Sequence, residues 1–301
     1  MIIRGDEALA SGMLTAYELR TDFKRILPGV YAPKRATLTD ADRAIAAVLW
    51  SRRQGVLTGG AAAAMHGATW VDPSPKPRDQ DKKRPLDVEL SHPNNRAPKG
   101  IRTRKENLLA DEVTRIRGVL VTTPARTAFD LARRGLVVPA VQALDALAQV
   151  ADFTVEDVAA VAAKHPGARG CRRVPEVLDL MDSGGQSPQE TYWRLRLLKE
   201  GYPRPQTQIP VPGPDGRTYF LDMGWQELMI AAEYDGEQHR TDRGQYVGDV
   251  RRSEWIALTW RRVRILGGDW AIDVFSRLRA LGLRASCTPP AILLAKKGVW
   301  P

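Results

Sequence analysis

The chain has 301 residues, of which 43% are hydrophobic, so we expect about two domains with apolar cores. Its two cysteines, Cys171 and Cys287, exclude a disulfide framework and the ligand spacing of a zinc site. The formal net charge of +10 favours a polyanionic partner, most simply nucleic acid, although an arginine-rich genome also explains it.

The first residues contain no apolar core of a signal peptide, and no uncharged apolar run is long enough to span a membrane. We therefore expect a soluble protein of the cytoplasm with no membrane partner.

Residues 6–20 predict one short helix, and residues 24–33 predict two short strands around the turn Pro28-Gly29. A helix followed by a basic hairpin is typical of the end of a winged helix. In that interpretation the side chains of Arg20, Lys24 and Arg25 contact DNA phosphates. The sequence before the hairpin has room for about one helix. A small hairpin that caps the following helices is therefore an equal alternative.

The rest of the first domain, residues 1–186, is predicted to be mostly helical with a small sheet. His66, at the end of a predicted helix, is expected to be a satisfied core or capping histidine. Residues 182–186 are small and polar, as in a domain boundary. The periodicity predicts helices over 39–52, 58–67, 125–134, 139–150, 154–164 and 174–181, and strands over 86–91, 100–104 and 118–122.

The second domain, residues 187–301, begins with Ser187 and Glu190, which have the spacing of a helix capping box. The fold class is α/β (α+β), with a mixed sheet flanked by helices. Two apolar runs, Tyr219–Met223 and Leu228–Tyr234, predict a central β-hairpin. The other predicted elements are helices over 187–199, 246–258 and 270–281 and strands over 206–211 and 260–266.

Three acids, Asp222, Glu233 and Asp235, lie within or at the ends of the central hairpin, and His239 follows closely. Burying an unpaired carboxylate costs several kcal/mol, so these acids need partners, and a divalent cation is a natural one. The alternative is that they are solvated turn residues. For Glu190, helix capping competes with any catalytic role.

The order helix, three strands, helix, strand, together with these acids, resembles the PD-(D/E)xK nuclease superfamily. It is most similar to the bacterial domains related to the very-short-patch-repair endonuclease. The matching pieces are Ser187–Glu190, Phe220–Asp222, Glu233–His239, Asp249–Arg252 and Trp260–Arg264.

This resemblance implies a Mg²⁺-dependent endodeoxyribonuclease, in which Mn²⁺ can substitute, acting in DNA repair or defence. Asp222 and Glu233 then bind the metal, and Asp235 and Glu190 are accessory acids, with Asp235 a third metal ligand. The superfamily signature has lysine where this chain has Asp235, so His239 or Arg252 is expected to replace it. Arg262 and Arg264 are expected to contact the DNA.

The first domain resembles the AbiEi-type antitoxin group through the segment Val121–Leu131, Val-Thr-Thr-Pro-Ala-Arg-Thr-Ala-Phe-Asp-Leu. Those proteins are DNA-binding regulators. The alternative to a nuclease is therefore a non-catalytic regulator or antitoxin that uses the nuclease fold as a scaffold. A third interpretation is a toxin–antitoxin component whose main contact is another protein.

Overall fold

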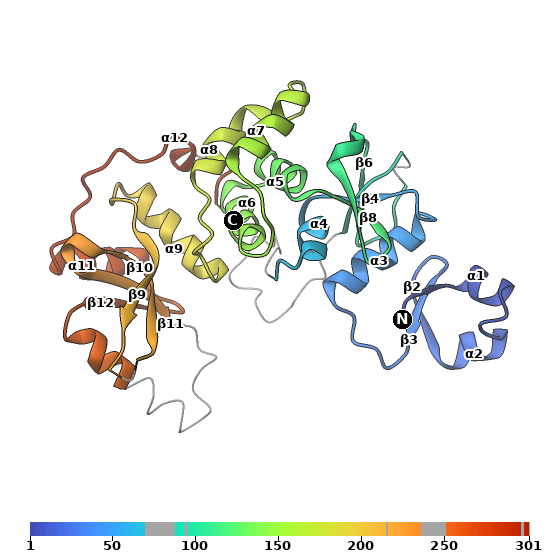
Figure 1. Cartoon of the computed structure of the whole chain (residues 1–301), viewed down its shortest axis with the longest axis horizontal. Coiled ribbons are helices and arrows are strands. Elements are labelled where there is room, and N and C mark those ends of the chain that lie inside the picture. The colour runs from blue at the N-terminus through green and yellow to red at the C-terminus, as the bar shows by residue number, and fades with distance from the viewer. Residues whose placement is uncertain (70–87, 94–95, 215, 236–250, 296–297, 301) are drawn as a thin grey trace. The chain divides into compact units, whose positions relative to one another are not determined.

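The computed structural model describes residues 1–69, 88–93, 96–214, 216–235, 251–295 and 298–300 (Figure 1). The chain folds into two compact units, Met1–Asp179 and Leu180–Trp300. The sequence predicted this boundary between residues 186 and 187, a few residues after the boundary in the structure. Both units combine helices with β-sheets, which confirms the mixed α and β class. Among the described helices, none has the length and apolar character that crossing a membrane requires.

The first unit begins with two short helices and a three-stranded sheet. The single helix predicted over residues 6–20 is wrong, because Thr15 starts a second helix through a capping box with Glu18. The predicted hairpin is confirmed, and its strands join the first strand of the chain in the order β1-β3-β2. The elements are β1 (Ile3–Arg4), α1 (Gly5–Ala10), α2 (Ala16–Thr21), β2 (Phe23–Leu27) and β3 (Val30–Pro33).

A five-stranded mixed sheet follows, in the order β6-β5-β4-β8-β7. Two of its strands, β4 and β7, were not predicted. Strand β4 has only two residues, which is too few to show an alternation of apolar and polar side chains. Helices α3 and α4 supply apolar side chains to the core over this sheet. The elements are α3 (Asp40–Trp50), β4 (Val56–Leu57), α4 (Gly59–His66), β5 (Val88–Ser91), β6 (Ile101–Arg104), β7 (Val113–Ile116) and β8 (Val119–Thr122).

Four helices complete the first unit, at the positions that the sequence predicts. They are α5 (Pro124–Arg133), α6 (Val137–Ala148), α7 (Val155–Lys164) and α8 (Val174–Asp179). Nε2 of His66 lies 2.8 Å from the carbonyl oxygen of Thr122. This contact confirms the prediction of a satisfied histidine.

The second unit is a four-stranded sheet in the order β12-β11-β10-β9. Strands β9, β10 and β11 form an antiparallel meander, and β12 returns parallel to β11. Residues 251–257 are helical. The other elements are α9 (Pro188–Lys199), β9 (Gln206–Pro212), β10 (Thr218–Trp225), β11 (Ile230–Asp235), β12 (Arg261–Leu266), α11 (Ala271–Ala280) and α12 (Ala291–Leu294).

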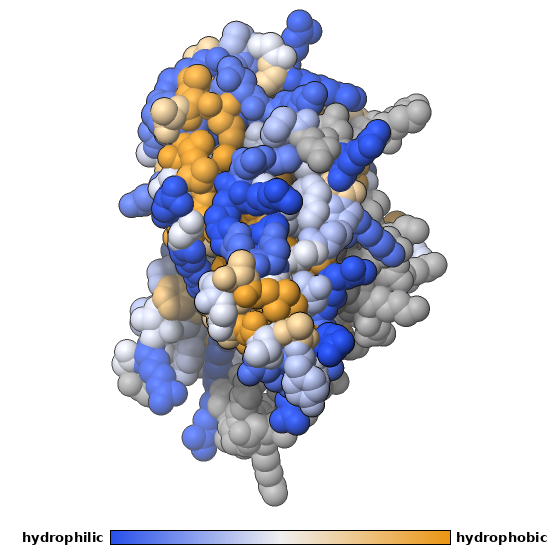
Figure 2. Space-filling view, turned by 90° about the vertical axis from the view of Figure 1, so that its right-hand side faces the viewer, coloured by the Kyte–Doolittle hydropathy of each residue, from blue (hydrophilic) through white to orange (hydrophobic). Residues whose placement is uncertain are grey.

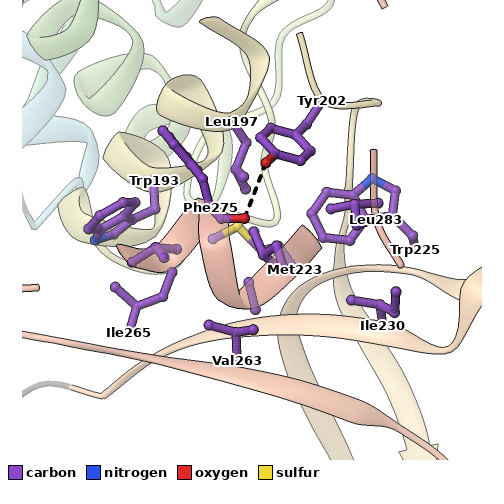
Figure 3. Close-up of a cluster of buried hydrophobic side chains, with 13 residues drawn as sticks. Trp193, Leu197, Tyr202, Met223, Trp225, Ile230, Val263, Ile265, Phe275 and Leu283 are labelled. Carbon is purple, nitrogen blue, oxygen red and sulfur yellow. Dashed lines mark hydrogen bonds between the residues drawn. The ribbon is translucent and has the colours of Figure 1, made fainter. Parts of the chain in front are cut away.

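Apolar side chains of helices α9 and α11 cover one face of this sheet (Figure 3). Trp193 and Leu197 of α9 pack with Val263 and Ile265 of β12, and the hydroxyl of Tyr202 donates a hydrogen bond to the carbonyl of Phe275. A second cluster, which includes Ile256 and Trp260, packs with residues of β9, β10 and β11. The polar residues of β10 and β11 must therefore be accommodated between two apolar cores.

Candidate functional site

The carboxyl group of Asp222, on β10, lies among other acids. Its Oδ2 accepts a hydrogen bond of 2.7 Å from the backbone N–H of Tyr234. Burial and the neighbouring Glu190 and Glu233 carboxylates raise the pKa of Asp222 to about 7, against the opposing effects of the Tyr234 N–H and Arg252. The side chains of Asp222 on β10, Glu233 on β11 and Glu190 on α9 are therefore close enough to interact electrostatically.

Glu190 occupies the first turn of α9 and caps it. Its backbone N–H donates to Oγ of Ser187 at 3.1 Å, and its carboxylate accepts from the backbone N–H of Gln186 at 2.9 Å. The carboxylate reaches one residue further back than in a standard capping box. Burial raises the pKa of Glu190, so this group combines a capping contact with a partly desolvated acid.

Glu233, on β11, forms ion pairs with two arginines. Nη1 of Arg262 lies 2.7 Å from Oε2, and Nη2 of Arg252 lies 3.4 Å from Oε1. The side chains of Glu233 and Arg262 are 12% and 10% exposed. Arg262, which the sequence suggested as a DNA contact, is thus largely buried against an acid.

Arg252 and Arg264, the other two predicted arginines, lie near this pair. Arg252 also donates to the carbonyl of Phe220 at 2.7 Å. Arg264 is exposed and donates to Oγ of Ser253 at 3.1 Å. Asp235, at the end of β11, is partly exposed, and His239 lies outside the described residues.

No three His, Cys, Asp or Glu side chains in the described part of the chain are arranged to hold a metal ion. Both carboxylate oxygens of Glu233 contact arginines. Metal binding by Asp222, Glu233 and Asp235 therefore stays a prediction, and it requires Glu233 to exchange its arginine partners for a cation.

The three basic residues predicted to contact DNA in the N-terminal hairpin are all exposed. Arg20 lies in the last turn of α2, and Lys24 and Arg25 lie on β2, which follows it. Nζ of Lys34 on the next segment donates to the carbonyl of Arg20 at 3.0 Å, which ties the hairpin to α2. Figure 2 shows a face on which polar side chains surround separate apolar groups.

A buried network of charged residues around Arg126 was not predicted. The Arg126 side chain is 1% exposed and forms ion pairs with Glu112 and Asp130. Arg133 extends the network to Asp130 and Glu106, and Nε2 of His165 lies 2.6 Å from Oε1 of Glu112.

This network borders a cavity of about 310 Å³. Burial by itself would raise the pKa of Glu106. The positive charges of Arg134 and Arg133 have the larger combined effect, so the pKa is lowered. The spacing of Arg126, Asp130 and Arg133 on one helix was a usable signal, because residues three and four apart share a helix face. The residues lining the cavity are Glu106, Asn107, Arg126, Lys164, His165, Pro166, Gly167 and Ala168.

Residues 54–180 match the family described as the AbiEi antitoxin C-terminal domain. The match contains the five-stranded sheet, α4 to α8 and the Arg126 network, which supports the resemblance seen in Val121–Leu131. The chain is also similar to two proteins of Mycobacterium tuberculosis, both named as uncharacterized: MT2308 of strain CDC 1551 / Oshkosh and Rv2248 of strain H37Rv. Each is 28% identical over 158 residues, which is 52% of this chain and 55% of the relative. The chain thus spans about half the length of these curated relatives.

Proposed function

We propose that this protein is a DNA-binding regulator of the antitoxin type. The observation that carries the proposal is the layout of residues 3–33, two helices and a three-stranded sheet, which is followed by α3 and then by a domain of the AbiEi antitoxin kind. In a helix-turn-helix the second helix contacts DNA, and in a winged helix the hairpin contacts DNA as well. Here those elements present Arg20, Lys24 and Arg25 to solvent.

Fluorescence anisotropy of the full chain with duplex DNA tests this proposal. One duplex carries the sequence upstream of the protein's own gene, and a second has the same composition in scrambled order. The variant Arg20→Ala/Lys24→Ala/Arg25→Ala should weaken binding to both duplexes. The control Lys105→Ala/Arg169→Ala/Arg172→Ala removes the same charge from other exposed positions of the first unit and should bind nearly as wild type. Equal losses for both triple variants would reject the hairpin as the DNA contact.

A second candidate function is metal-dependent hydrolysis of DNA by the second unit. Its support is the buried Asp222 carboxyl, whose pKa is raised by burial and by the acidic neighbours Glu190 and Glu233, while Arg252 opposes them. Hard oxygen ligands of this kind suit Mg²⁺ or Mn²⁺. A bound cation would supply Lewis acidity and a water of lowered pKa.

In that reaction, Asp222 and Glu233 would hold the cation, Glu190 and Asp235 would serve as accessory acids, and Arg252 and Arg264 would neutralise the phosphate. His239 is expected to accept a proton from the attacking water. A cleavage assay on supercoiled, linear and single-stranded DNA, with Mg²⁺, Mn²⁺ or EDTA, tests this candidate. Cleavage that requires the cation and is lost in Asp222→Asn supports it. Cation-independent or absent cleavage leaves the regulator as the better account.

A further inference from the structure

One side of helix α9 carries an aromatic ring and two positive charges. Tyr192, Arg196 and Lys199 follow one another at intervals of four and three residues, so they share one face of the helix. We call these three residues the α9 stripe. The side chains of Trp193 and Leu197 belong to the apolar core of the second unit, and Tyr192 packs against the edge of that core. The α9 stripe therefore borders the core, with its two cations beyond it.

The indole ring of Trp300 covers the α9 stripe. It meets the ring of Tyr192 edge to face, with 5.6 Å between the ring centroids. The guanidinium carbon of Arg196 lies 5.3 Å from the indole centroid, and Nζ of Lys199 lies 5.1 Å from it. One flat aromatic ring is thus surrounded by a tyrosine and two cations.

The two cations of the α9 stripe have no anionic partner within the described residues. Arg126 and Arg262 form ion pairs with acids, whereas the side chains of Arg196 and Lys199 contact only the indole there. In this part of the chain, Nε of Arg196 is buried and meets no hydrogen-bond acceptor. A buried donor without an acceptor lowers stability, and an oxyanion would supply the acceptor.

The indole of Trp300 is held at the α9 stripe by weak contacts. Its Nε1 donates to the carbonyl oxygen of Leu293 at 3.4 Å, which is long for an N–H to oxygen hydrogen bond. The side chains that anchor this segment are instead Leu293 and Val299, which are 0% and 2% exposed. The indole can therefore leave the α9 stripe while these two anchors stay buried.

A nucleotide offers both of the groups that the α9 stripe can bind. Its base is a flat ring that packs on tyrosine and arginine side chains, and its phosphate accepts hydrogen bonds from arginine and lysine. We propose that the α9 stripe binds an unpaired nucleotide of single-stranded DNA, and that Trp300 takes the place of the base when DNA is absent. The site adds a contact on the second unit to the proposed function, from which it takes only that DNA is the partner.

Fluorescence anisotropy of a short labelled oligothymidylate with the full chain tests this proposal. Trp300→Ala uncovers the α9 stripe, and Trp300→Ala/Arg196→Gln/Lys199→Gln also removes its two charges. Trp300→Leu, which keeps apolar bulk without an aromatic ring, replaces Trp300→Ala in both variants if the melting temperature shows that alanine unfolds the chain.

Two controls match these variants. Trp270→Ala removes an indole that is 75% exposed and belongs to α11 rather than to the α9 stripe. Trp300→Ala/Arg279→Gln/Arg284→Gln uncovers the α9 stripe and removes two exposed arginines elsewhere in the second unit.

Trp300→Ala should bind the oligothymidylate about five- to tenfold more tightly than wild type, because the indole no longer competes with the base. Trp270→Ala should bind as wild type does. Removing Arg196 and Lys199 should abolish the gain and make the slope of log K against log salt less negative by about 1.4, as expected for two phosphates of a single strand. The control that removes Arg279 and Arg284 should keep most of the gain.

An unchanged or weaker affinity in Trp300→Ala would overturn the proposal and show that the indole is only a packing contact. Equal losses in the two charge-removing variants would also overturn it. Either result, with duplex binding that still depends on the N-terminal hairpin, rejects the α9 site alone. A gain in Trp300→Ala with duplex binding that does not depend on the hairpin rejects the proposed hairpin contact alone.

Discussion

Glu233 forms its closer ion pair with Arg262, although Arg264 lies directly opposite Glu233 in the parallel register of β11 and β12. Arg262 pairs with Ala231 in that register, two residues earlier, and its side chain reaches diagonally along the strands. Arg264 donates to Ser253 instead. Of the two arginines that β12 contributes to the site, Arg262 therefore pairs with the acid and Arg264 is exposed.

The stability of the protein should depend on the ionisation of Asp222. Its pKa in the folded state, about 7, is above the ordinary value of 3.8, so the folded state holds an extra proton between these values. The free energy of unfolding should then fall as pH rises from about 4 to about 7 and change little above that. Because one pH unit corresponds to about 1.4 kcal/mol, the full effect is at most on the order of 4 kcal/mol.

Asp222→Asn removes this penalty and keeps an oxygen for the Tyr234 N–H. In EDTA it should be more stable than wild type at pH 8 and similar at pH 4.5, as measured by urea unfolding at both values. Reduced stability of the variant at pH 8 would show instead that the ionised Asp222 is a structural partner of a cation.

Arg126 should be essential for the stability of the first unit. Arg126→Leu leaves Glu112 and Asp130 buried without this guanidinium, and breaking a buried ion pair costs about 3–5 kcal/mol. Urea unfolding measures the loss. Lys164→Ala, which removes the exposed ion pair with Asp111 at the same cavity, is the control and should unfold nearly as wild type. A similar stability of the two variants would contradict the structural role of the network.

DNA binding by the N-terminal hairpin should appear in its salt dependence. If Arg20, Lys24 and Arg25 each neutralise a phosphate, their joint replacement by alanine should make the slope of log K against log salt less negative by about 2 to 3. Anisotropy titrations at several salt concentrations between about 50 and 300 mM measure this slope. An unchanged slope with weaker binding would mean that the substitutions act through folding.

Gly224→Ala should destabilise the second unit. A Cβ atom at this position would lie 2.7 Å from the carbonyl oxygen of Ile230 and 3.1 Å from Cδ1 of Ile209, so β10 and its neighbours must shift. Overpacking of this kind costs about 1–3 kcal/mol. Differential scanning calorimetry should show a lower melting temperature. Gly167→Ala, where a Cβ meets nothing within 4 Å, is the control and should have no such effect.

The amino-acid sequence alone determined the elements whose signals are local. Thr39 with Asp42 and Thr154 with Asp157 cap α3 and α7 across three residues, and the apolar runs of the central hairpin specify β10 and β11. The strand acids were recognisable because carboxylates are unusual in apolar strands. These interactions depend on neighbours in the chain, so a pattern in the sequence is enough to predict them.

Only the tertiary structure decided which partners these side chains have. Glu233 meets Arg262 from another strand, and Arg126 meets Glu112 from a different element, so no local pattern specifies either pair. The split of residues 6–20 into α1 and α2 has, by contrast, a local cause, the capping box of Thr15 and Glu18, which the pattern of apolar residues does not reveal. Long-range packing sets the distances between charges, and those distances determine whether an acid forms an ion pair with an arginine or is available to other partners.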